Sequence, residues 1–171
     1  GYYSHAEGKE TISHGINSHA EGHETLASGS YSHAEGKSTA AYGEGSHAEG
    51  LLTIASGSYS HAQGYETQAL GKGSFAGGIG TVADNDSQTA IGSYNVAGDP
   101  SAVFVVGTGK NGAPQDGFSV RVDVDQISSI TIPSSKDLPS NPIVGTLFLN
   151  PTDQVLYIYL GVLVGWKTIK I

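Results

Sequence analysis

The sequence predicts an all-β protein whose N-terminal part, residues 1–98, winds into a single-stranded β-solenoid of 14-residue coils. Three observations predict this fold class. One five-residue motif recurs every 14 residues, a second motif lies halfway between its copies, and the chain has 25 glycines, one tryptophan and no cysteine or methionine. A chain so poor in large side chains cannot build a thick core, so its order must come from repetition.

The first motif, Ser-His-Ala-Glu-Gly, returns in register along the first half of the chain. Its copies begin at Ser4, Ser18, Ser32 and Ser46, and a copy with Gln in place of Glu begins at Ser60. The second motif has the form Thr-x-Ala-x-Gly, and its copies begin at Thr25, Thr39, Thr53 and Thr67, with a copy at Thr11 that has Ser13 in place of Ala. Each coil therefore consists of two five-residue arms joined by two-residue links.

Small residues occupy the first, third and fifth positions of both arms, and alternate residues of a strand share one face. We therefore expect Ser or Thr, Ala and Gly to point inward, with glycine at the corners adopting unusual backbone angles. A helix is excluded because one or two glycines per coil would each cost about 1 kcal/mol. Collagen is excluded because glycine does not recur every third residue. Such a core buries little apolar area, so we expect association with other chains.

The repeat stops at Asp99, and the remaining sequence predicts two further β parts. Three short alternating apolar runs follow, at 103–106, 118–124 and 127–132. They predict a β-strand neck over 99–132. A linker rich in Pro and Ser at 132–142 opens the C-terminal module, 133–171, in which we expect a β-hairpin followed by one more strand.

The Ser-x-Ala-x-Gly arms resemble the head repeats of trimeric autotransporter adhesins, the YadA-like left-handed β-roll, over about 90 residues. Their His-Ala-Glu-Gly form is similar to repeats in bacteriophage and prophage tail fibre proteins. Residues 102–109 and 117–122 resemble the strand-turn-strand neck that follows such repeats, and the C-terminal segment resembles a small module common in phage tail proteins. The resemblance implies a homotrimer packed about a threefold axis. Adhesins carry mostly aliphatic outward residues on the interface arm, whereas the most regular arm here carries His and Glu, so either arm could face the axis.

The outward residues of the first arm are the candidate binding groups of the solenoid. The histidines at this position are His5, His19, His33, His47 and His61. Around a threefold axis each coil would present three imidazoles and three carboxylates, a set that suits zinc or another divalent ion. The preferred interpretation is a hydrogen-bonded His–Glu network that fixes the trimer register, so no metal site and no cofactor is assigned. If the ladder is buried, trimer stability should change between about pH 5 and 7 as His titrates.

Three aromatic residues near the C-terminus, Tyr157, Tyr159 and Trp166, are candidates for stacking on the sugar rings of a receptor. Core packing is the preferred interpretation of all three. No catalytic residue is assigned, because nucleophile elbow, phosphate loop and HExxH motifs are absent from the sequence. A ladder of equivalent glutamates also lacks the two unlike carboxylates of a glycosidase. We therefore expect a protein that is not an enzyme.

Charge and hydropathy narrow the possible partners. The net charge of −8 and the scattered Lys and Arg residues argue against nucleic acid, and no apolar stretch reaches the roughly 18 residues of a membrane span. The leading hypothesis is a structural and receptor-binding segment of a trimeric bacteriophage or prophage tail fibre, located in the virion tail. Its expected partners are other tail proteins and a bacterial surface receptor or glycan. The alternatives are the head of a trimeric adhesin on a bacterial surface and a fibre-associated glycan hydrolase.

Overall fold

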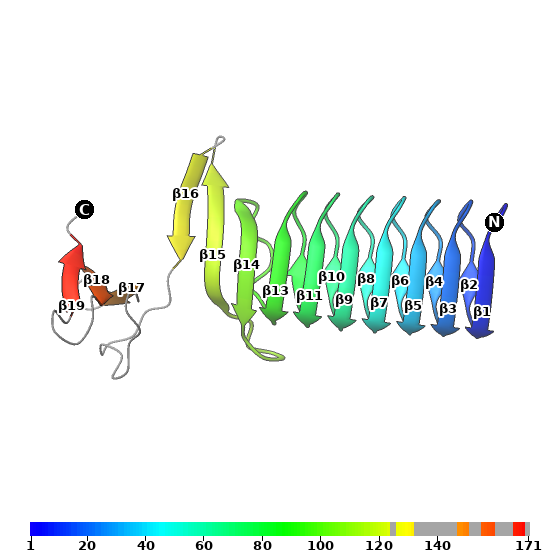
Figure 1. Ribbon diagram of the computed structural model, residues 1–171, viewed down its shortest axis with the longest axis horizontal. Helices are drawn as coiled ribbons and strands as arrows, with labels where there is room; N and C mark the ends of the chain where they lie inside the picture. The colour runs from blue at the N-terminus through cyan, green and yellow to red at the C-terminus, as the bar shows by residue number, and fades with distance from the viewer. Residues whose placement is uncertain (124–125, 132–146, 151–154, 160–165, 170–171) are drawn as a thin grey trace. The chain divides into compact units, whose positions relative to one another are not determined.

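The computed structural model describes residues 1–123, 126–131, 147–150, 155–159 and 166–169 (Figure 1). Every regular element in these ranges is a β-strand, and the described residues contain no helix. The prediction of an all-β chain is therefore confirmed. The chain divides into two compact units, Gly1–Ser129 and Ile130–Ile171, and each is described by itself.

About seven stacked coils form the solenoid, and each coil contributes one strand to each of two sheets, except the last, which contributes only to the first. The first arms give β1 (His5–Lys9), β3 (His19–His23), β5 (His33–Lys37), β7 (His47–Leu51), β9 (His61–Tyr65), β11 (Phe75–Ile79) and β13 (Thr89–Ser93). The second arms give β2 (Ile12–Ser13), β4 (Leu26–Ala27), β6 (Ala40–Ala41), β8 (Ile54–Ala55), β10 (Gln68–Ala69) and β12 (Val82–Ala83). Neighbouring strands are parallel and pair residues 14 apart, as His19 pairs with His33. The predicted solenoid and its period are confirmed.

The core of the solenoid consists of alanine with serine and threonine beside it. The alanine at the third position of successive arms is 0% exposed in every copy from Ala20 to Ala90. The Ser or Thr at the first position is also buried, as Ser18 and Thr25 illustrate. The prediction that these two positions face inward is therefore confirmed.

The two arms use glycine differently. In the second arm Gly29 is buried, and a Cβ at this position would lie 2.0 Å from the carbonyl oxygen of Gly43 in the next coil. In the first arm Gly22 is exposed and has a φ of 112°, a left-handed angle at which the alternation of faces along the strand breaks. The prediction that this glycine faces inward is wrong.

The second residue of each two-residue link also adopts a left-handed backbone. It does so whether or not it is glycine, with φ of 58° at Glu24 and 60° at Tyr31. The conformation costs about 1 kcal/mol for a residue other than glycine. Each link is tied to the previous coil, because the Glu24 N–H donates to the Lys9 carbonyl at 2.9 Å and the Tyr31 N–H to the Ile16 carbonyl at 2.8 Å. The unusual angles predicted for the corner glycines therefore occur at the first-arm glycines, such as Gly22, and also at link residues for which they were not predicted.

The solenoid sheet continues into strands that do not belong to the repeat. β14 (Ala102–Thr108) pairs in parallel with β13, and its buried Val105 lies opposite Ala90, in line with the alanine core. β15 (Asp116–Asp123) pairs with β14 in the antiparallel direction, and β16 (Gln126–Thr131) is the last strand of this ten-stranded sheet. These strands cover the apolar runs from which the neck was predicted.

The C-terminal unit contains a three-stranded antiparallel sheet. Its strands are β17 (Leu147–Asn150), β18 (Val155–Tyr159) and β19 (Trp166–Ile169), with β18 in the centre. The predicted hairpin and the following strand are thus confirmed. The predicted linker at 132–142 lies outside the described residues.

Candidate functional site

The candidate histidines form one continuous stack of imidazole rings along the first-arm face of the solenoid. The stack contains His5, His19, His33, His47 and His61. Neighbouring ring centroids are 4.7–5.1 Å apart and neighbouring planes differ by 7–22°, because the rings repeat with the spacing of parallel strands. Phe75 continues the stack with an edge contact to His61 at 5.4 Å. The structure therefore brings all five predicted candidates together.

From Glu21 onward, the glutamates of the first arm contact the histidines of the following coil, whereas Glu7 lies 3.7 Å from His5 of its own coil. The Glu35 Oε1 atom lies 3.3 Å from the His47 Nε2 atom, within hydrogen-bond distance. Equivalent atoms are 3.4 Å apart between Glu49 and His61, and 3.9 Å apart between Glu21 and His33. The histidine and glutamate ladders thus contact each other from coil to coil within one chain. Their role in fixing the trimer register stays a prediction.

The surroundings of His33 within the stack favour its neutral form. Burial lowers the pKa of His33 below its usual 6.5, and repulsion from His47 and His19 lowers it further, against the opposing effect of Glu35 and Glu21. The Nε2 atom of His33 is buried and has no hydrogen-bond partner in the part of the chain that the structure describes. At neutral pH this ring therefore keeps a lone pair available to accept a proton or a metal ion.

Among the described residues, two groups of side chains have the composition and spacing of metal ligands. His33, Glu35 and His47 each offer one ligand atom, and these atoms lie within 4.8 Å of one another. Glu10, His23 and Glu24 form a second group at a link between the arms. The first group belongs to the predicted ladder, whereas the second was not predicted because His23 occurs at its position in one coil only.

The aromatic candidates of the C-terminal unit lie on neighbouring strands. Tyr157 and Tyr159 belong to β18, Trp166 begins β19, and Tyr159 pairs with Trp166 across the two strands. Their side chains lie outside the described part of the chain. A role in receptor binding stays a prediction for these three residues.

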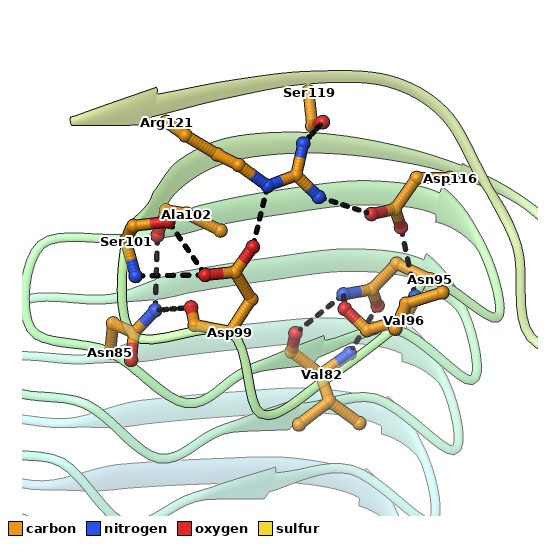
Figure 2. Close-up of polar contacts among 10 residues, drawn as sticks. All are labelled: Val82, Asn85, Asn95, Val96, Asp99, Ser101, Ala102, Asp116, Ser119 and Arg121. Atoms are coloured by element: carbon orange, nitrogen blue, oxygen red, sulfur yellow. Dashed lines mark hydrogen bonds and ion pairs between the residues drawn. The ribbon is translucent and has the colours of Figure 1, made fainter. Parts of the chain in front are cut away.

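A polar cluster that the sequence did not reveal caps the second sheet of the solenoid. The Asn95 side chain, in a residue only 3% exposed, takes the place of a further strand beside β12 (Figure 2). Its Oδ1 atom accepts the Val82 N–H at 2.8 Å, and its Nδ2 group donates to the Val82 carbonyl at 2.9 Å. Asn85 stands where earlier coils have a buried glycine, and its Nδ2 group donates to the carbonyls of Asp99 and Ala102. The Asn95 amide thereby satisfies two backbone groups of Val82 that the end of the repeat would leave unpaired.

Arg121 ties the cap to β15, as Figure 2 shows. Its Nε group donates to Asp99, and its Nη2 group lies 3.4 Å from Asp116. The Ser101 hydroxyl donates to the other Asp99 oxygen at 2.6 Å. Hydrogen bonds from the Ser101 hydroxyl and from Arg121 lower the pKa of Asp99 to about 2. The carboxylate is therefore charged throughout the physiological pH range and anchors the solenoid end to the following hairpin.

Comparison with protein-family models found no match to this chain, and comparison with curated proteins found no significant match either. In the described part of the chain, no helix has the length and apolar character needed to cross a membrane. The function of this chain is therefore inferred from its repeat and from the side chains that the repeat exposes.

Proposed function

We propose that this chain is a structural and receptor-binding segment of a trimeric bacteriophage or prophage tail fibre, located in the virion tail. The observation that carries the proposal is the distribution of apolar side chains, with small ones inside the solenoid and larger ones on its surface. The solenoid core contains nothing larger than alanine among its apolar residues between Ala20 and Ala90. Larger apolar residues lie outside, and Ile12, Leu52, Leu70 and Ile79 are 39–47% exposed.

This distribution supports association between copies of the chain. A methyl-sized core contributes little at about 25 cal/mol per Å² of buried apolar area, while ordering each residue costs about 1–2 kcal/mol. Burial of the exposed apolar residues against equivalent coils of other copies would add the missing stabilisation. Three copies about one axis agree with the resemblance of the repeat to trimeric heads and fibres.

Exposed tyrosines support a role in attachment. Tyr3, Tyr31 and Tyr59 occupy the same link position in every second coil, and each is more than half exposed. The Tyr59 hydroxyl lies 3.3 Å from the Glu44 carboxylate, to which it donates a hydrogen bond. Flat aromatic rings beside polar groups suit the apolar faces and hydroxyls of a surface glycan. With Tyr157, Tyr159 and Trp166 they are the candidate receptor contacts.

Adsorption of the labelled chain to a broad panel of bacterial strains tests this proposal. We expect strain-selective adsorption, weakened by Tyr31→Ala together with Tyr59→Ala, and unchanged by Ser56→Ala at an exposed position of the second arm. The proposal assigns no enzymatic activity, so the surface glycans of the bound strain should stay intact. An associated, folded chain that adsorbs to no strain would contradict the proposal, and glycan turnover would favour the hydrolase alternative.

A further inference from the structure

The strongest unassigned feature of the solenoid is the group of nitrogen and oxygen atoms in the third and fourth coils. We propose that His33, Glu35 and His47 of a single chain form a binding site for a divalent transition-metal ion of the zinc class. The inference does not depend on the fibre proposal, since all three ligands come from one chain.

The ligand set fits such an ion. Two imidazoles and one carboxylate are a combination that zinc accepts, with a fourth position left for water or another donor. The Glu35 Oε1 and His47 Nε2 atoms are already 3.3 Å apart, which matches the separation of two ligands at about 2.0–2.1 Å from a tetrahedral ion. His33 is the third candidate ligand, since all three ligand atoms lie within 4.8 Å of one another, and its ring would have to turn toward the other two to bind the same ion.

The surroundings hold these ligands in place. The side chains of His47 and Glu35 are 32% and 35% exposed, so each is largely packed yet reachable from solvent. His19 and His61 stack on the outer sides of His33 and His47, with centroids 4.9 and 4.7 Å away. Rings confined between other rings lose little freedom when they bind an ion, and this favours affinity.

The ring of His33 also has an unused ligand atom. Its Nε2 atom is buried and has no hydrogen-bond partner among the described residues, so no existing hydrogen bond has to be broken when it binds an ion.

The group at Glu10, His23 and Glu24 is the weaker candidate and provides a matched control. Its carboxylates already have other partners, because Glu24 accepts the Ser38 hydroxyl at 2.8 Å and Glu10 lies 3.6 Å from the Lys9 ammonium. A zinc ion would have to compete with both. His23→Phe therefore removes a histidine from the same solenoid without touching the proposed site.

Calorimetric titration of zinc chloride into the chelator-treated whole chain at about pH 7.5 tests the proposal. We expect one ion per chain in the wild type. His33→Phe and His47→Phe keep an aromatic ring at a position where a later coil naturally has Phe75, but remove a ligand. Each should therefore weaken binding at least about tenfold. His23→Phe should bind as the wild type does.

Imidazole NMR spectra identify the ligands directly, and circular dichroism checks that each variant keeps its β content. Zinc should shift the ring resonances of His33 and His47 more than those of His5 or His23. The proposal is overturned if the His33→Phe/His47→Phe double variant binds zinc like the wild type. It is also overturned by absence of binding to the wild type at millimolar zinc, or by a stoichiometry of one ion per three chains.

Discussion

Replacement of Asn95 by alanine should open the end of the second sheet while leaving the middle of the solenoid intact. In the native chain the Asn95 amide makes hydrogen bonds to both backbone groups of Val82, at 2.8 and 2.9 Å. Asn95→Ala removes both bonds together. The Asn95 amide supplies the partners that a further coil would supply if the repeat continued. Without it, the Val82 N–H and carbonyl are left unpaired.

The size of the effect follows from the desolvation of these two groups. A buried backbone group without a partner costs about 1–3 kcal/mol. Water can enter the space left by the shorter side chain, so we take the lower end for each group, about 2 kcal/mol in total. Since 1.4 kcal/mol corresponds to a factor of ten, amide hydrogen exchange at Val82 should accelerate by about 30-fold.

Native-state hydrogen exchange measured by NMR provides the assay, since it reports local opening residue by residue. Ala48, in the centre of the alanine core, should keep its protection. Asn95→Asp should have a smaller effect at neutral pH, because a carboxylate still accepts the Val82 N–H but cannot donate to its carbonyl. Asn111→Ala, in an exposed turn, is the matched control. Exchange at Val82 within a factor of two of the wild type would refute the assigned role of Asn95.

Three further predictions concern the core, the cap and the ladder. Gly57→Ala places a Cβ 1.9 Å from the Gly71 carbonyl oxygen, so chemical denaturation should reveal a loss of about 3 kcal/mol or more, whereas Ser56→Ala should be neutral. The pKa of Asp99 is about 2 in the folded chain against an ordinary value of 3.8. The contribution of its carboxylate to the stability of the fold is therefore complete above about pH 4 and is lost as pH falls toward 2. Thermal melts of Asp99→Asn should lack this pH dependence. The pKa of His33 is lowered from 6.5 in the folded chain, so protonation of this ring favours unfolding. The melting temperature should therefore fall as pH drops below 6.5. A melting temperature that is flat down to about pH 5 would contradict this.

The sequence predicted the solenoid well because the position of a residue within the 14-residue unit determines its environment. Ala48 and Ala20 are both buried because they occupy the same position of the unit in different coils. His33 stacks on His19 because the two residues are 14 positions apart in the sequence. Periodicity therefore determined the strands, the inward alanines and the outward His and Glu ladders. The contact of each Glu with the next coil depends on side-chain rotamers, which the repeat alone does not specify.

The failures occurred where backbone conformation is not encoded by residue type. The left-handed link position carries Glu24, Tyr31 or Leu52, none of which favours that conformation by itself. The parallel coils on both sides impose it. In the same way Gly22 turns outward because its positive φ breaks the alternation from which its inward position was inferred.

The cap was missed although part of it is visible in the sequence. Asn85 interrupts the series of buried glycines, and Asn95 stands where earlier coils have threonine. Both departures mark positions whose outer side no further coil covers, so a larger polar side chain fits there. The pairing of Asp99 with Arg121 could not be predicted, because it joins residues from different elements after the repeat has ended.

The mass of the whole chain in solution tests the central claim most directly. A solenoid with an alanine core and exposed aliphatic residues should be stable only in association with its own copies. Sedimentation equilibrium at neutral pH should therefore give three times the chain mass of 17.5 kDa, and Leu52→Glu combined with Leu70→Glu should dissociate the assembly. A wild-type chain that sediments as a folded 17.5-kDa monomer would contradict the account.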